Sequence, residues 1–180
     1  HFVVNNLAMA NIDAKVRELR DLVHAPYYPW FANYMVVKRA AQEPNFHAVY
    51  SALVDKWEDR SFRNNFISTT VHYCRVMLIS KLLKSNSSER TLLKNLGAWL
   101  GKITLAKNRP VLQKDLDVKA TIIKAYEEGK MLAVLSFIRQ LLDPAIDSKV
   151  FRPPNPWVMA ICALLAEIYN LENLKTGLKF

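Results

Sequence analysis

Apolar residues recur along this chain at the three- and four-residue spacing of an α-helix, and the strict alternation typical of β-strands is hard to find. The clearest stripes are Leu92, Leu93, Leu96, Trp99, Leu100 and Ile103; Leu132, Leu135, Ile138, Leu141 and Leu142; and Val158, Ile161, Leu165 and Ile168. Residues 16–23, 31–37, 46–57 and 62–83 follow the same period less closely. The pattern predicts about eight helices, each about 10 to 20 residues long.

Helix-capping residues support several of these boundaries. Asn155 before Pro156 combines a favoured N-cap with a favoured first-turn residue, so we expect a helix to start at position 157. Asp117 can cap a helix over residues 118–128, which Gly129 then ends. Polar connections over residues 84–90 and 107–115 separate further helices.

The helices also follow a longer period. Helix pairs are expected to start near positions 13, 46, 89, 117 and 157, a spacing of roughly 40 residues. This period predicts an all-α fold in which HEAT-like helical hairpins stack into an α-solenoid and each pair buries its apolar face against its neighbour. A compact irregular helical bundle is the alternative. Residues 1–180 are expected to form a single domain, because no low-complexity tract or interdomain linker interrupts them.

Charge and cysteine content narrow the classes of partner. The formal net charge is +9, but the 25 basic residues are spread along the chain without a run of five, which predicts weak nonspecific RNA affinity more than a dedicated groove. No apolar run approaches the roughly 20 residues that span a bilayer, and no signal-peptide pattern opens the sequence. Without a CxxC motif, Cys74 and Cys162 are expected to be buried, reduced thiols of a cytosolic protein, with a disulfide or metal pair as the alternative.

Motifs for catalysis are missing from the sequence. The four histidines form no HxxxH or HExxH pair, and neither a glycine-rich phosphate loop nor GxSxG occurs, so we expect no metal, no cofactor and no enzymatic activity. Asp115 and Asp117 suggest paired carboxylates, but their place before an apolar-periodic segment favours helix capping. The remaining class of function is binding.

The first candidate binding cluster lies in the stretch KRAAQEPNFH, residues 38–47. Pro44 disfavours helical geometry at Glu43 and so ends a helix there, after which Asn45 can cap the next one. Arg39 and Glu43 are four residues apart and share a helix face. They can form an intrahelical ion pair, or they can present a guanidinium and a carboxylate beside a free amide to a partner.

The second cluster lies in the stretch LLKNLGAWLGKITLAKNRP, residues 92–110. Asn95, Trp99 and Lys102 share one stripe of the expected helix, so Trp99 is either an exposed interface anchor or a side chain packed between hairpins. Gly97 and Gly101 would each cost about 1 kcal/mol in an exposed helix, and they indicate close approach to a neighbouring helix.

The third cluster is VFRPPNPW, residues 150–157. Its three prolines predict a stiff connection into the next hairpin that exposes Phe151 and Arg152, and the same loop is a candidate contact ridge.

These three stretches resemble the MIF4G-type central domain of the large scaffold subunit, Not-one, of the CCR–NOT deadenylase complex. The quoted motifs are PWFANYMVVKRAAQEPNFHAVY, LLKNLGAWLGKITLAKNRP and FRPPNPWVMAI…LLAEIY…LKF, and the likeness covers essentially the whole chain. The resemblance implies a HEAT-like α-solenoid and a further helical segment after Phe180.

The resemblance also implies a function. It implies a noncatalytic scaffold that docks a Caf-type deadenylase and a DEAD-box RNA helicase, coupling poly(A) shortening to translational repression and mRNA decay. It implies a cytoplasmic location, including mRNA-decay granules, with the nucleus as a second location. Arg39, Glu43 and Asn45 match the family's helicase-contacting motif, and Asn95 and Trp99 are carried over only as residues of the helicase-facing side. A direct RNA-binding helical module, motivated by the net charge, is the alternative.

Overall fold

A computed structural model of the protein describes residues 2–171. Within this range the chain forms nine α-helices, a few short 3₁₀ segments, one π-helical segment and no β-strand. The helices are α1 (Phe2–Asn5), α2 (Ile12–Leu22), α3 (Tyr28–Tyr34), α4 (His47–Lys56), α5 (Arg60–Ile79), α6 (Ser87–Ile103), α7 (Val118–Glu127), α8 (Met131–Leu142) and α9 (Pro156–Tyr169). The all-α prediction is therefore confirmed, and helices start near all five positions where the period places the pairs.

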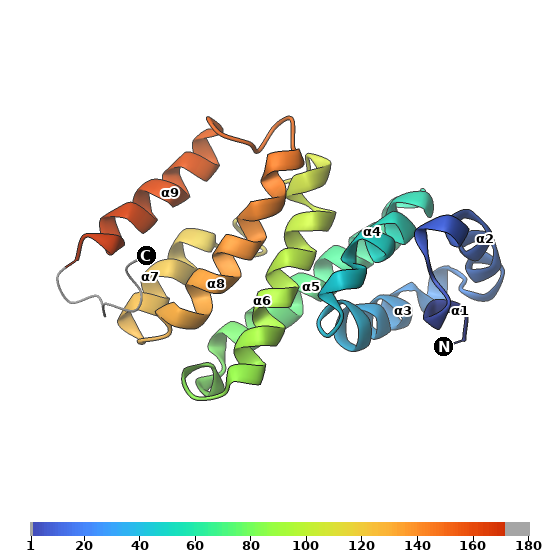
Figure 1. The fold of residues 1–180 in the computed structure, drawn as a ribbon, viewed down its shortest axis with the longest axis horizontal. Coiled ribbons are helices and arrows are strands. Elements are labelled where there is room, and N and C mark those ends of the chain that lie inside the picture. The colour runs from blue at the N-terminus through green and yellow to red at the C-terminus, as the bar shows by residue number, and fades with distance from the viewer. Residues whose placement is uncertain (1, 172–180) are drawn as a thin grey trace.

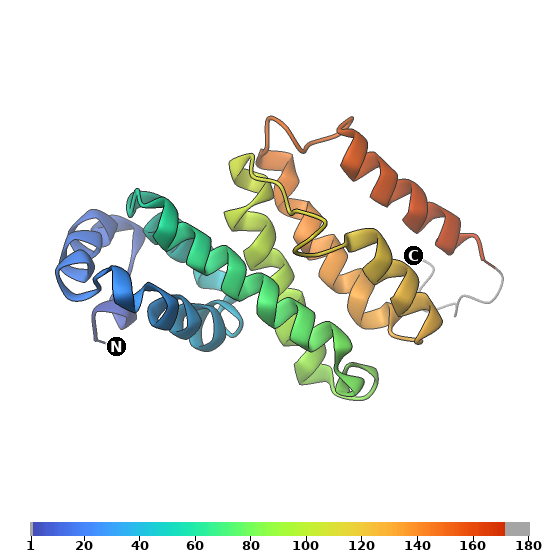
Figure 2. The same cartoon turned by 180° about the vertical axis from the view of Figure 1, so that it is seen from behind.

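The helices pack in series along the molecule. Helix α2 contacts α4, α3 contacts α5, α6 packs against α4, α5 and α8, and α7 contacts both α8 and α9. The molecule is accordingly elongated, with the N-terminal helices at one end and α9 at the other (Figure 1). Turned by 180°, it presents α5, α7 and the segment that joins α6 to α7 (Figure 2). This serial packing is that of an α-solenoid, as predicted, whereas the HEAT repeat type stays a prediction.

Helices α6 and α8 form the closest helix pair of the stack because two glycines remove side chains from their contact. A Cβ atom at Gly97 would lie 2.7 Å from the backbone oxygen of Phe137, and one at Gly101 would lie even closer to the backbone oxygen of Leu141. These distances are shorter than real Cβ contacts, so no larger side chain fits at either position without a shift of α8. The prediction of close helix approach is confirmed.

Local features of the sequence set three helix ends where they were predicted, namely the start and end of α7 and the start of α9. The Asp117 side chain accepts a hydrogen bond from the backbone N–H of Ala120 at 2.9 Å, and Asn155 accepts from the N–H groups of Trp157 and Val158. Gly129, after α7, has φ +65°, a conformation that glycine adopts without strain. The connection predicted over residues 84–90 is shorter, because Asn86 caps α6 and the helix already starts at Ser87.

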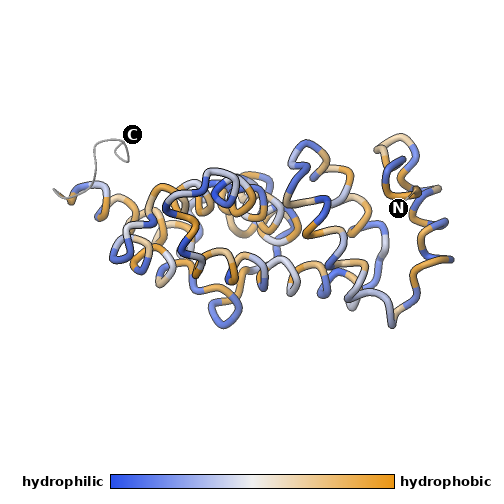
Figure 3. Tube along the Cα trace, turned by 90° about the horizontal axis from the view of Figure 1, so that it is seen from below, coloured by the Kyte–Doolittle hydropathy of each residue, from blue (hydrophilic) through white to orange (hydrophobic). Residues whose placement is uncertain are grey.

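The core runs through the stack as one cluster of buried apolar side chains. Hydrophobic and hydrophilic positions alternate along the individual helices (Figure 3), and none of the helices in residues 2–171 is long and apolar enough to cross a membrane. The stripe expected on α8 is shifted in phase, since Leu132 is 55% exposed whereas Val134 and Phe137 are buried. The expectation of two buried thiols holds for Cys74 but is wrong for Cys162, which lies on the outer face of α9; both thiols are free.

Candidate protein-interaction site

The first predicted cluster lies at the junction between α3 and α4. The chain leaves α3 through the π-helical segment Met35–Ala40, turns, and enters α4 through the 3₁₀ segment Pro44–Phe46. The π geometry shows in the hydrogen bond from Ala41 N–H to the Val36 oxygen, a five-residue step. Such segments are rare in proteins and frequently lie at functional sites.

Arg39 and Glu43 form an ion pair with each other, which is the first of the two alternatives given for them from the sequence. Arg39 Nε lies 3.2 Å from Glu43 Oε2, at ion-pairing distance but without the alignment of a hydrogen bond. The Tyr50 hydroxyl, on α4, donates a short hydrogen bond to the same carboxylate oxygen. Sequence reasoning missed Tyr50 because it lies on the next helix, beyond the break at Pro44, where the spacing along one helix no longer applies. The pair is still accessible, with 20% and 30% of the two side chains exposed.

The surroundings raise the pKa values of both Arg39 and Tyr50, which favours a charged guanidinium and a neutral phenol. Burial lowers the pKa of the Arg39 guanidinium, but its contacts with Tyr50 and Glu43 outweigh this effect, so the pKa lies above its ordinary value. Burial raises the pKa of Tyr50 to about 12, and the hydrogen bond to Glu43 raises it as well. At neutral pH Arg39 is therefore a fixed cation, paired with the Glu43 side chain, and Tyr50 is a neutral hydrogen-bond donor.

Asn45 and Phe46 stand at the tip of this junction. Both residues are exposed, and the Phe46 ring stacks on Tyr50 with 6.0 Å between ring centroids. The expectation that Asn45 caps α4 is wrong, since Phe46 occupies the N-cap position of that helix and no side chain caps it. Within residues 2–171 the Asn45 amide has no hydrogen-bond partner, which leaves it open to a partner protein. Phe46 adds an exposed aromatic ring that spacing alone did not single out.

The second predicted cluster lies in the interior. Trp99 has no exposed surface and Asn95 is 8% exposed, so the alternative of an exposed anchor is wrong and the alternative of a side chain packed between helices is confirmed. The reason is the position of α6, which is covered by α4, α5 and α8 and therefore has little free face. Trp99 packs near Phe66 of α5, with ring centroids 6.4 Å apart.

These interior residues nevertheless support the junction. The Asn95 side-chain amide donates a 2.8 Å hydrogen bond to the backbone oxygen of Ala41, which lies 54 residues earlier in the chain. The His47 ring lies 5.4 Å from the Trp99 ring, centroid to centroid, and its Nε2 donates a 2.7 Å hydrogen bond to the Ala40 oxygen. Asn95 and Trp99 thus support the turn that carries Glu43 and Asn45 from the interior side, through the hydrogen bond to Ala41 and the contact with His47.

The third predicted cluster is a stiff connection, as favoured from its prolines. The Asn108 side-chain oxygen accepts hydrogen bonds from the Ser148 hydroxyl at 2.9 Å and from the Lys149 N–H at 2.8 Å. The expectation that Phe151 is exposed is wrong, because its ring is partly buried and packs edge-on against Trp157, with ring centroids 6.2 Å apart. Arg152 is exposed, so its candidate role as a contact residue stays a prediction. The end of the quoted motif, residues 178–180, lies outside the described residues.

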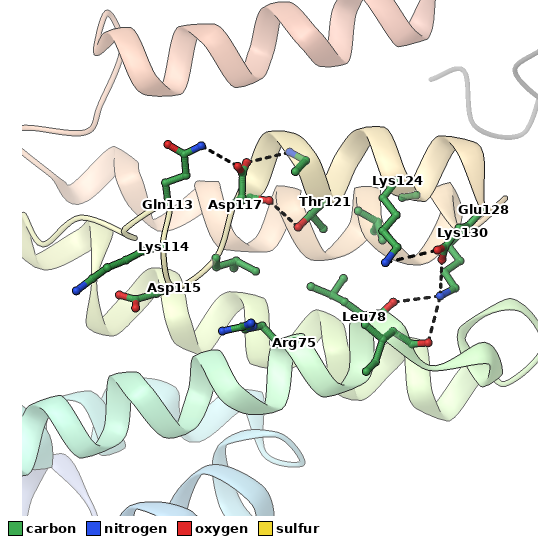
Figure 4. A pocket seen from close by; sticks show the side chains of 15 residues that line it. Arg75, Leu78, Gln113, Lys114, Asp115, Asp117, Thr121, Lys124, Glu128 and Lys130 are labelled. Atoms are coloured by element: carbon green, nitrogen blue, oxygen red, sulfur yellow. Dashed lines mark hydrogen bonds and ion pairs between the residues drawn. The ribbon is translucent and has the colours of Figure 1, made fainter.

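A cavity of about 300 Å³ lies between α5, α7 and residues 113–117, and several ionisable side chains line it. Asp117, Glu128 and Lys130 among these side chains hold helix ends, whereas Arg75, Lys114 and Asp115 make no drawn interaction (Figure 4). Lys130 Nζ donates to the backbone oxygens of Leu78 and Ile79 and pairs with Glu128 at 2.7 Å, and Asp117 caps α7. Residues 2–171 also hold no group of three or more His, Cys, Asp or Glu side chains placed to share a metal ion.

Comparison with known proteins identifies the family. The family described as the CCR4-NOT transcription complex subunit 1 CAF1-binding domain matches residues 1–180. The chain belongs to this family. The subunit 1 relatives include the general negative regulator of transcription subunit 1 of Saccharomyces cerevisiae, 36% identical over 99% of this chain, and its namesake of Schizosaccharomyces pombe, 32% identical over 99%.

A third relative is the CCR4-NOT transcription complex subunit let-711 of Caenorhabditis elegans, 36% identical over 99% of this chain. The chain covers only 8% of the length of each yeast subunit 1 and 7% of let-711. The resemblance to the CCR–NOT scaffold subunit is thus confirmed for this segment.

Proposed function

We propose that this chain is a noncatalytic scaffold domain that docks a Caf1-type deadenylase and a DEAD-box RNA helicase. The observation that carries the proposal is the match of the whole chain to the CAF1-binding domain of subunit 1. A rigid stack with a continuous core suits this role, because it fixes the separation and orientation of whatever binds to it. In this role the domain acts in the cytoplasm, where poly(A) shortening and translational repression are coupled.

The mechanism we propose is one of proximity. Two enzymes held on one platform meet at an effective concentration on the order of millimolar, far above their free concentrations in a cell. A partner that binds one arrangement of the two helicase lobes better than another also shifts the helicase toward that arrangement. The domain itself makes and breaks no covalent bond in this scheme.

We place the helicase contact at the α3–α4 junction. Arg39 and Glu43 offer a paired guanidinium and carboxylate, and Asn45 offers an amide without an internal partner. Phe46, 47% exposed beside them, adds apolar area of the kind that dominates interface energies. The deadenylase is placed on a different face of the stack, so that both partners bind at once.

The test is retention of purified partners by the immobilised chain, with the helicase and the deadenylase added separately and together. Glu43→Lys is expected to lower helicase retention at least about tenfold, because a lysine beside Arg39 faces the partner with two like charges. Deadenylase retention is expected to stay unchanged. Asn45→Ala is the milder variant, since it removes a side chain that no internal hydrogen bond uses.

Glu127→Lys, at an exposed position on α7, makes the same charge change elsewhere and is expected to leave both partners bound. Circular dichroism checks that each variant is folded. Helicase retention that survives Glu43→Lys would move the docking site away from the junction. Failure of the unmodified chain to retain the deadenylase would end the scaffold proposal itself.

A further inference from the structure

A basic groove runs between α5 and the segment that joins α6 to α7, two elements that face the viewer in Figure 2. Its volume is about 850 Å³. Five lining residues are basic and one is acidic, namely Arg60, Arg63, Arg75, Arg109 and Lys114 against Asp115. This local excess differs from the even spread of charge along the sequence, because folding brings residues 60–75 of α5 next to residues 109–114.

The positive charge in this groove is poorly neutralised by the protein. Asp55 is shared, at 2.7 Å from Lys107 Nζ and 3.7 Å from an Arg109 nitrogen. Arg63 Nε is buried and has no hydrogen-bond partner. Burial lowers the pKa of Arg109, and the nearby Arg63 guanidinium lowers it further. The Arg109 guanidinium therefore lies near that of Arg63 and shares its one carboxylate with Lys107, and no ion pair of Arg63 is found within residues 2–171. An external anion that joins the two guanidinium groups relieves their repulsion.

The α5 side of the groove carries hydrogen-bond donors in a row. Arg60, Asn64, Ser68, His72 and Arg75 follow one another at three- and four-residue steps and therefore lie along one helix face. At 1.5 Å per residue, the row from Arg60 to Arg75 is about 22 Å long. A row of this length can contact several consecutive phosphates of an extended strand.

This face of α5 is separate from the one that adjoins the α3–α4 junction. A second groove lies near the junction and is bounded on α5 by Tyr73, Val76 and Met77. Its lining on the junction side is Val36, Val37, Ala41 and Gln42. In the basic groove α5 instead presents His72 and Arg75, which lie on another stripe of the helix. An occupant of the basic groove therefore contacts other α5 residues than those beside the junction.

The chemistry of the lining favours a phosphate chain over an acidic peptide. Guanidinium groups bind phosphate oxygens with two parallel hydrogen bonds, and four of the five cations are arginines. Nine of the thirteen lining residues are polar or charged, and the apolar ones are Ile67, Val71, Pro110 and Leu112, so the lining offers a protein partner few apolar anchors. Leu112 is 44% exposed and offers a surface on which an unstacked base can lie.

We propose that this groove binds single-stranded RNA through its backbone phosphates, without sequence preference. Arg60 and Arg75 contact phosphates at the two ends of the row, and Arg63 and Arg109 neutralise phosphates between them. Figure 4 shows Arg75 on α5 and, across from it, Lys114 and Asp115 of the connecting segment. The proposal does not rest on the docking of either protein partner, since it uses other residues.

The experiment measures fluorescence anisotropy of a labelled oligoadenylate of about 15 nucleotides, a length within the range of known single-strand sites. The chain is compared with the double variant Arg60→Glu/Arg75→Glu, at about 50 and 200 mM salt. Both side chains are exposed, and neither forms an ion pair within residues 2–171, so the variant is expected to fold. Loss of two phosphate contacts should weaken binding at least about tenfold and reduce the salt slope by about 1.4.

The matched control is Arg17→Glu/Lys94→Glu, which makes the same change in net charge at two exposed positions outside the groove. It is expected to keep most of the affinity. An equal loss in both double variants would show that RNA responds only to net charge, and the groove proposal would be overturned. A labelled oligoglutamate peptide is the second probe: if the groove variant loses the peptide but keeps the RNA, the groove takes an acidic protein segment instead.

Discussion

Two stretches that look alike in sequence have opposite positions in the fold. Residues 38–47 and 92–103 each combine polar and aromatic residues at helical spacing, yet the first forms a junction at the surface and the second forms the most enclosed helix of the stack. Glu43 keeps 30% of its side chain exposed, whereas Trp99 keeps none. This difference in exposure is set by the neighbouring helices, because α6 is covered on several sides whereas the junction lies where the chain reverses direction.

The two stretches are also parts of one construction. Asn95 holds the Ala41 oxygen, and Trp99 lies against His47, which itself holds the Ala40 oxygen. The buried stretch therefore fixes the shape of the exposed one. Substitutions within the buried stretch are expected to cost stability, and substitutions at the exposed tip are expected to cost binding.

The largest effect should come from Trp99→Ala. Truncation of a buried tryptophan leaves a cavity and is expected to lower the free energy of unfolding by about 3–5 kcal/mol in urea titrations. Trp99→Phe should cost less, because it keeps an aromatic ring and removes an indole N–H that has no acceptor. Trp30→Ala, at a position that is 61% exposed, is the matched control and should change stability little. A small effect of Trp99→Ala would mean that α6 is not the interior of the stack.

An intermediate effect is expected on the other side of α6, at Gly101→Ala. Helix propensity alone predicts a gain of about 1 kcal/mol. The added Cβ would, however, meet the Leu141 backbone of α8, and overpacking of this kind costs about 1–3 kcal/mol. We therefore expect a net loss of stability in urea titrations. A variant more stable than the parent would show that α6 and α8 are farther apart than the structure has them.

Sequence reasoning predicted what is local and failed where distant elements meet. The caps at Asp117 and Asn155 depend on the two or three residues that follow them, and both were found at the predicted positions. Close packing at Gly101 was also predictable, since a glycine inside a helix needs a reason. The burial of Trp99 could not be predicted in this way, because α6 packs against helices on several sides and even its polar stripe is covered. The exposure of Cys162 was also missed, because α9 is apolar on faces that its described neighbours leave uncovered, so an apolar pattern there does not mean burial.

The site was predictable to a similar degree. The ion pair of Arg39 and Glu43 follows from their spacing. The hydrogen bond from Tyr50, the π-helical segment and the supporting contact from Asn95 all depend on tertiary packing, which no window of the sequence contains. The basic groove was missed altogether, because Arg63 and Arg109 are 46 positions apart in the chain and meet only in the fold.

The smallest effect, and the one that joins the two stretches, concerns the pH dependence of His47. Burial lowers the pKa of its imidazole, the hydrogen bond to the Ala40 oxygen opposes this shift, and the nearby Lys102 ammonium adds to it. In the unfolded chain the ring regains its ordinary pKa of about 6.5. Between the two pKa values the unfolded chain binds more protons, so the free energy of unfolding falls as the pH drops below about 6.5.

The measurement is urea unfolding between about pH 7.5 and 5.5 for the parent chain and for His47→Gln. The parent is expected to lose more stability than the variant over this range, because only the parent must expel a proton to fold. His24→Gln, at an exposed position, is the matched control and is expected to keep the parent's profile. Parallel profiles for the parent and His47→Gln would show that this ring is solvated in solution. The support that Trp99 gives to the docking junction would then be looser than the contacts imply.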